Sequence, residues 1–120
     1  AAVFEKGMEE VARGDFDDAV RAFEKAVKAD AGNADFFSML GYSHRKLGEY
    51  DAAFENYRQA LSLDPAHRGA HEYVGEAYVE TGNLAMADRH LARLAEICPS
   101  GCPEYDELAA FRRDHAGPVE

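Results

Sequence analysis

A single spacing organises this sequence, because small residues recur at a step of 34 positions. Three sets fall on this step, namely Gly7, Gly41 and Gly75; Gly14, Gly48 and Gly82; and Ala19, Ala53 and Ala87. Pro65 and Pro99 are separated by the same step. A fixed period of this length indicates stacked units that each pack on their neighbours. The sequence therefore predicts a repeat architecture.

Each unit contains two stretches with a helical spacing of apolar residues. In the first unit Ala19, Phe23 and Ala26 recur at intervals of four and three, as expected for one face of a helix. The pair Gly14-Asp15, like its equivalents one and two steps later, separates two such stretches. Glycine can close one helix, and an acidic or amide residue suits the start of the next. Each unit is thus predicted to be a helical hairpin.

The glycines at 7, 41 and 75 lie inside the predicted first helices, where glycine costs about 1 kcal/mol relative to alanine. We expect them to allow a close crossing with the second helix of the unit at Ala19, Ala53 and Ala87. Pro65 and Pro99 are expected to end the second helices of their units.

The second unit carries Leu40-Gly41, Gly48-x-Tyr50-x-x-Ala53, Tyr57, Ala60 and Pro65. This pattern closely resembles the tetratricopeptide repeat, or TPR. The resemblance implies an all-α fold, a right-handed superhelical α-solenoid of three hairpins and a C-terminal solvating helix, seven helices in total. It places the repeats at about 1–33, 34–67 and 68–101 and the capping helix at about 103–115, within one domain over residues 1–120.

Composition and motifs exclude several classes of function. Acidic residues outnumber basic ones by 23 to 13, which gives a net charge of −10 and argues against nucleic acid as a partner. No apolar run approaches the length of about 18 residues that a membrane span needs, so membrane insertion is not expected. Catalytic motifs such as a nucleophile elbow or a phosphate-binding loop are absent from the sequence. We expect neither an enzyme nor a bound cofactor.

The TPR resemblance implies a scaffold that binds a peptide segment or a partner protein in the concave groove formed by the first helices. The groove positions carried over are Phe4, Met8, Val11, Ser38, Tyr42, Arg45, Glu72, Glu76 and Val79, with Ala12, Lys46 and Glu80 beside them. They are first apolar, then aromatic and basic, then acidic. This order predicts a ligand that has an apolar anchor and at least one basic residue.

Two alternatives concern this predicted groove. Phe4 and Met8 could instead pack against each other or against a second copy of the chain, which would make the protein a self-assembling module. Glu72, Glu76 and Glu80 could simply form a solvated stripe. The TPR clamp that grips the C-terminal carboxylate of chaperone tails is not expected, because its positions hold Phe4, Met8, Met39, Gly69 and Tyr73.

The two cysteines, Cys98 and Cys102, lie where the last repeat meets the capping helix. A disulfide between them would fix the angle of that helix and would imply an oxidising compartment such as the bacterial periplasm. Free thiols in a cytoplasmic protein are the second interpretation. The third is a transition-metal or redox-responsive site that adds His67 and His71. The tail around the cysteines also resembles that of small exported bacterial TPR proteins, which favours a periplasmic or otherwise exported location.

Overall fold

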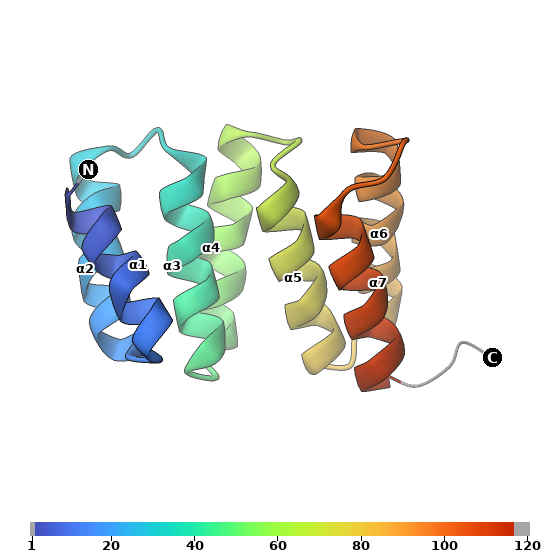
Figure 1. Cartoon of the computed structure of the whole chain (residues 1–120), viewed down its shortest axis with the longest axis horizontal. Coiled ribbons are helices and arrows are strands. Elements are labelled where there is room, and N and C mark those ends of the chain that lie inside the picture. The colour runs from blue at the N-terminus through green and yellow to red at the C-terminus, as the bar shows by residue number, and fades with distance from the viewer. Residues whose placement is uncertain (1, 117–120) are drawn as a thin grey trace. The chain divides into compact units, whose positions relative to one another are not determined.

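The computed structural model describes residues 2–116, and all of their regular secondary structure is helical (Figure 1). The helices are α1 (Ala2–Arg13), α2 (Phe16–Ala29), α3 (Ala34–Lys46), α4 (Tyr50–Leu63), α5 (Arg68–Glu80), α6 (Leu84–Ile97) and α7 (Pro103–Ala116). The predicted all-α class with seven helices is confirmed. None of these helices combines the length and the apolar character needed to cross a membrane.

The chain divides into two compact units, Ala1–Pro65 with α1 to α4 and Ala66–Glu120 with α5 to α7. The predicted ends of the second helices, before Pro65 and Pro99, are confirmed in both units. The second helix of the second hairpin ends at Leu63, just before Pro65, and that of the third ends at Ile97, just before Pro99. That residues 1–120 form one domain stays a prediction.

The three hairpin turns share one backbone geometry. Gly14, Gly48 and Gly82 have φ angles of +76°, +76° and +83°, which glycine adopts without steric cost. In each turn the next residue donates its backbone N–H to a carbonyl five residues earlier, as Asn83 does to Tyr78 at 2.8 Å. This bond is typical of a helix that ends at a left-handed glycine. The 34-residue step therefore repeats the same turn three times.

In the first unit the core forms where the helix glycines face large rings. A methyl group built on Gly41 would lie 2.8 Å from the Tyr57 ring, and one on Gly7 would overlap the Phe23 ring. Phe23 and Tyr57 are both fully buried. The glycines are thus needed because of an aromatic ring on the second helix, and at Gly41 the methyl group would also lie 3.1 Å from the backbone oxygen of Ala53, the predicted crossing point. This ring lies one turn beyond the alanine that the sequence suggested as the crossing point.

The second unit places α7 against both helices of the third hairpin, with the larger contact on α5. Leu108 of α7 is fully buried, as are Ala77, Ala87 and Leu94. The helix runs from Pro103 to Ala116, so the predicted capping helix at about 103–115 is confirmed.

Candidate functional site

In α1, the three predicted groove residues differ in their accessibility. The Phe4 ring stacks on the Phe36 ring at a centroid distance of 4.7 Å. It also packs against the Phe23 ring in a tilted arrangement, with 5.5 Å between the centroids. Val11 is half-buried against the same core cluster. Met8 is 39% exposed. Phe4 therefore stabilises the fold of the first unit, and Met8 is the most accessible of these three side chains.

In α3, Tyr42 lies beside two cations. The Arg45 guanidinium carbon is 5.6 Å from the centroid of the Tyr42 ring, and the Lys46 ammonium nitrogen is 5.5 Å from it. The edge of the same ring faces Phe16 at 6.3 Å. Cations at this distance are attracted by the electron-rich face of an aromatic ring. Arg45 is buried, whereas Lys46 is exposed and Tyr42 is half-buried.

Ser38, the remaining predicted groove residue of α3, is 2% exposed. Within the described part of the chain its hydroxyl oxygen has no hydrogen-bond partner. A buried hydroxyl without a partner costs free energy, so Ser38 does not stabilise the fold through this group.

In α5, the predicted groove residues Glu72, Glu76 and Val79 are all buried. The carboxyl group of Glu72 is hydrogen-bonded to Glu76 and to Glu107 of α7. Burial, followed by these two carboxyl neighbours, raises the pKa of Glu72 to about 10. At neutral pH Glu72 is therefore protonated and can donate a hydrogen bond to a neighbouring carboxylate. The hydrogen-bonded carboxyl groups of Glu72, Glu76 and Glu107 thus join α5 to α7. Because Glu72 is neutral, it offers no charge to a basic ligand.

Exposure thus separates the predicted groove residues into two groups. Met8, Tyr42 and Lys46 of the first unit have accessible surface, and they combine an apolar, an aromatic and a cationic side chain. Glu72 and Glu76 of α5, by contrast, are buried and engaged within the second unit, whereas Glu80 is exposed. The sequence missed the role of Glu107, because the partner of Glu72 lies on a helix outside the three repeats.

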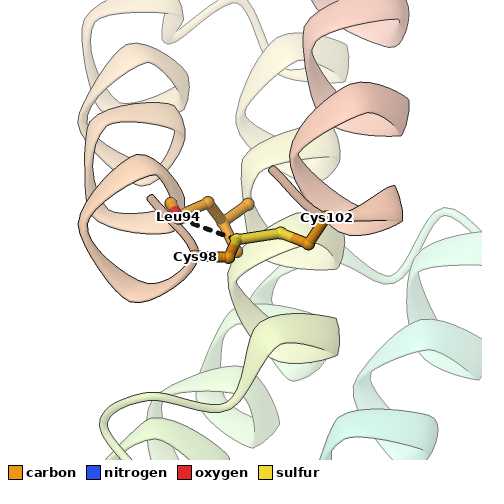
Figure 2. Close-up of a disulfide and its surroundings, with 3 residues drawn as sticks. All are labelled: Leu94, Cys98 and Cys102. Atoms are coloured by element: carbon orange, nitrogen blue, oxygen red, sulfur yellow. Dashed lines mark hydrogen bonds between the residues drawn. A yellow bond between two sulfur atoms is a disulfide. The ribbon is translucent and has the colours of Figure 1, made fainter. Parts of the chain in front are cut away.

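The structure brings the sulfur atoms of Cys98 and Cys102 together at the turn between α6 and α7, in the position of the predicted disulfide (Figure 2). Both cysteines are buried, and their Cα atoms lie 6.0 Å apart. Cys98 is also the C-cap residue of α6, and its sulfur lies 2.9 Å from the carbonyl oxygen of Leu94. A reduced Cys98 thiol could donate a hydrogen bond to this oxygen.

The four-residue metal site that was the third interpretation of the sequence is not assembled. The Nδ1 atom of His67 accepts a hydrogen bond from the backbone N–H of Ala70 at 2.9 Å, which caps α5. His71 instead faces His90 of α6, with 2.9 Å between their Nδ1 atoms. The structure therefore gives no support to a transition-metal or redox site built from Cys98, Cys102, His67 and His71. The sequence showed His90 as an unremarkable helix residue and gave no signal for this pairing.

A separate hollow of about 420 Å³ lies on the first hairpin, and none of the predicted groove residues lines it. Its lining residues are Val3, Lys6, Glu10, Asp18, Arg21, Ala22 and Lys25. Glu10, Asp15 and Asp18 form the one close group of three or more potential ligands found among the described residues. Glu10 is already paired with Lys6 at 2.9 Å and with Arg13 at 3.1 Å, so its charge is compensated locally.

Comparison with protein families finds two matches, both to TPR models. One, described as tetratricopeptide repeat, matches residues 4–55, and the other, described as TPR repeat, matches residues 41–82. Among curated proteins, the chain is 33% identical over 86 residues to protein bimA of Emericella nidulans. This match covers 72% of the chain and 11% of bimA. The chain spans only about a tenth of the length of the first such relatives.

Solved structures with the same fold include two TPR proteins that carry bound peptides. The first TPR of Spaghetti (RPAP3), bound to the HSP90 peptide SRMEEVD, has a TM-score of 0.82 at 22% identity, and the match covers 96% of this chain and 91% of that one. The type III secretion chaperone SycD of Yersinia enterocolitica, in complex with a peptide of the translocator YopD, has a TM-score of 0.81 at 21% identity. This match covers 96% of the present chain and 90% of the SycD chain.

Proposed function

Because this chain belongs to the tetratricopeptide repeat family, we propose that it is a non-enzymatic module that binds a peptide segment or partner protein along α1 and α3, the first helices of the two hairpins in its first unit. Three kinds of support exist. The family models match residues 4–82 when taken together. Proteins of the same fold bind peptides, as in the complexes with HSP90 and YopD peptides. The first helices also carry the accessible apolar and cationic side chains described above.

The observation that supports this proposal most is the arrangement around Tyr42. Its ring lies about equally far from a buried cation, Arg45, and an exposed one, Lys46. Such a ring offers packing area at a low cost in side-chain entropy, and Lys46 can pair with a carboxylate. Because Glu72 is buried and protonated, the accessible residues favour a ligand with an apolar anchor and an acidic residue. This differs from the basic residue that the sequence suggested.

Panning a displayed random-peptide library against the full chain tests this proposal. Enriched peptides should bind the wild-type chain and should bind a Tyr42→Ala, Lys46→Ala double variant at least tenfold more weakly. The matched control replaces Glu55 and Arg58, an exposed ion pair on α4, by alanine and should bind normally. Equal binding to all three proteins would show that the peptide does not bind at Tyr42 and Lys46 of α3.

The HSP90 peptide SRMEEVD tests whether this chain uses the TPR carboxylate clamp. The positions that correspond to the TPR carboxylate clamp hold Phe4, Met8, Met39, Gly69 and Tyr73. These side chains cannot supply the paired cationic and amide groups that such a carboxylate needs. The chain should therefore not grip the C-terminal carboxylate of SRMEEVD through such a clamp, although the RPAP3 domain of the same fold is seen in complex with this peptide.

Self-association through the first hairpin is the second candidate function, and the exposure of Met8 favours it. Methionine is common at adaptable binding surfaces. Light scattering across a wide concentration range should reveal a concentration-dependent dimer that Met8→Lys abolishes. A constant monomer mass for the wild-type chain would exclude this candidate.

The disulfide leads to a proposal about location. A disulfide that persists in the native protein fits an oxidising compartment, such as the bacterial periplasm, and both sulfurs are shielded by burial. Thiol titration of denatured protein, taken directly from its native compartment, should find no reactive thiol. Two reactive thiols would favour the cytoplasmic alternative.

A further inference from the structure

Two large apolar side chains within residues 2–116 are exposed, namely Met8 of α1 and Leu63 of α4, at 39% each. Leucine carries only carbon and hydrogen beyond its backbone, whereas methionine carries a thioether sulfur that can be oxidised. Met8 also belongs to the proposed peptide surface, together with Tyr42 and Lys46. The structure thus places an oxidisable atom at the accessible apolar position of that surface.

The chain has three methionines, and the other two are less accessible than Met8. Met39 packs against the buried core cluster of the first unit, and it is half-buried there. Met86 of α6 is also half-buried. An oxidant must reach the sulfur atom to react, so burial slows the reaction. We therefore expect Met8 to be oxidised before Met39 and Met86.

The reaction at Met8 is a two-electron oxidation by a peroxide. Hydrogen peroxide transfers one oxygen atom to the sulfur, so a sulfur–oxygen bond forms, the oxygen–oxygen bond breaks, and the second oxygen leaves as water. The sulfur is oxidised, the peroxide is reduced, and no other reactant is consumed. The product is methionine sulfoxide, which dedicated reductases convert back to methionine. The modification is therefore reversible.

The sulfoxide changes the polarity of Met8, because its oxygen is a strong hydrogen-bond acceptor. In the free chain water can solvate this oxygen, since the side chain is exposed, so we expect the fold to persist. In a complex, an apolar ligand group packed on Met8 would displace that water without offering a hydrogen bond. Burying a polar group in this way costs free energy, so the affinity for the ligand should fall.

We propose that Met8 is a reversible oxidation site, and that its conversion to the sulfoxide weakens ligand binding at the surface of Met8, Tyr42 and Lys46. This inference rests on the proposed peptide-binding function and adds a means of regulating it. It differs from the redox-responsive site considered from the sequence, which used the cysteines. Both cysteines are buried, whereas the Met8 side chain is accessible to a peroxide.

Treatment of the full chain with hydrogen peroxide tests this proposal, with mass spectrometry to locate the added oxygen and circular dichroism to follow helicity. Met8 should be oxidised before Met39 and Met86, with no loss of helicity. Once Met8 is fully converted, a peptide selected by panning should bind about tenfold more weakly. Earlier oxidation of Met39 or Met86, or undiminished binding after complete conversion of Met8, would overturn the proposal.

A double variant, Met8→Leu with Leu63→Met, is the matched control, because it moves the exposed thioether from α1 to the end of α4. Position 63 should then be oxidised by the same treatment, yet the treated variant should bind the peptide as tightly as the untreated variant does. Both proteins keep the same cysteines, so an effect of peroxide on Cys98 or Cys102 would appear in each. An equal loss of affinity in the double variant would overturn the role of Met8.

The test separates failure of this inference from failure of the proposed function. If the Tyr42→Ala, Lys46→Ala variant binds the selected peptide as the wild type does, the proposed surface is wrong, and the inference fails with it. If that variant loses binding while the chain with oxidised Met8 keeps it, the proposed function stands and the oxidation site alone is refuted.

Discussion

Leu108 of α7 occupies the space that the absent side chain of Gly75 leaves on α5. A methyl group on Gly75 would lie 2.5 Å from a methyl carbon of Leu108, and Leu108 is fully buried. In the first two hairpins the equivalent space is filled by Phe23 and Tyr57, which belong to the same hairpin as the glycine. The third repeat is therefore completed by the terminal helix, which acts as part of its core.

Leu108→Ala should lower the free energy of unfolding by about 2–5 kcal/mol, because it leaves a cavity in a packed site. Gly75→Ala should cost about 1–3 kcal/mol through overpacking. In the double variant the new methyl group enters the new cavity, so the combined loss should be smaller than the sum. Urea denaturation of the four proteins measures this cycle.

Leu91→Ala is the matched control, since Leu91 is the residue that the 34-residue register places opposite Gly75 and is only half-buried. It should cost less than Leu108→Ala and should be additive with Gly75→Ala. Additivity between Gly75 and Leu108 instead would mean that the two residues do not share one space.

The hairpins were predictable because their signals are local. Gly48 fixes a left-handed turn, and the spacing of Ala53, Tyr57 and Ala60 fixes the buried face of one helix. The partner of Gly75 was not predictable, because Leu91 and Leu108 are both leucines at suitable positions. Only tertiary packing decides between them.

The same limit applies to the candidate site. The resemblance to TPR proteins predicted that α3 lines a binding groove, yet it could not reveal that Arg45 is buried and Lys46 exposed. It also could not reveal that Glu72 shares its hydrogen bonds with Glu107. Such differences depend on which neighbour covers each side chain, and one sequence does not encode that as a local pattern.

An ion pair anchors the far end of α7 to α6. Arg112 donates from Nε to Asp88 at 3.1 Å and from Nη2 at 3.3 Å, and Arg112 is 8% exposed. Asp88→Asn should destabilise the chain by about 1–2 kcal/mol, because it removes the charge that compensates a largely buried guanidinium. Asp114→Asn, which affects the exposed neighbour of Arg113, should cost less than about 0.5 kcal/mol. Equal melting temperatures for the two variants would contradict this account.

Glu72 should make the stability of the chain depend on pH. Its pKa is about 10 in the folded state and 4.5 in the reference state, so between these values the folded chain binds more protons than the unfolded chain. The contribution to stability is fully present below pH 4.5 and is lost as the pH rises through 10. We therefore expect the free energy of unfolding to fall between pH 7 and pH 10.

Glu72→Gln should reduce this fall, because glutamine stays neutral over the whole range. Replacement of the exposed Glu96 by Gln serves as the control and should keep the wild-type slope. Urea midpoints at four pH values give the comparison. A slope in Glu72→Gln as steep as in the wild type would exclude Glu72 as its source.

The disulfide should stabilise the joint between α6 and α7. The bond closes a ring of five residues and so lowers the conformational entropy of the unfolded chain. In the chain-entropy model this stabilises the folded state by on the order of 2 kcal/mol. Dithiothreitol should therefore lower the melting temperature of the wild-type protein, whereas a Cys98→Ser, Cys102→Ser variant should melt at one temperature with or without the reductant. No response of oxidised wild-type protein to reduction would show that the bond does not contribute to stability.

We propose above that a partner binds along α1 and α3, the first helices of the two hairpins in the first unit. Backbone amide chemical shifts of the isotope-labelled chain, recorded with and without a peptide selected by panning, test it most directly. We expect the largest shifts to cluster on these helices around Met8, Tyr42 and Lys46, with little change at Glu55 and Arg58 of α4. Shifts concentrated on α2, α4 and α6 would contradict it.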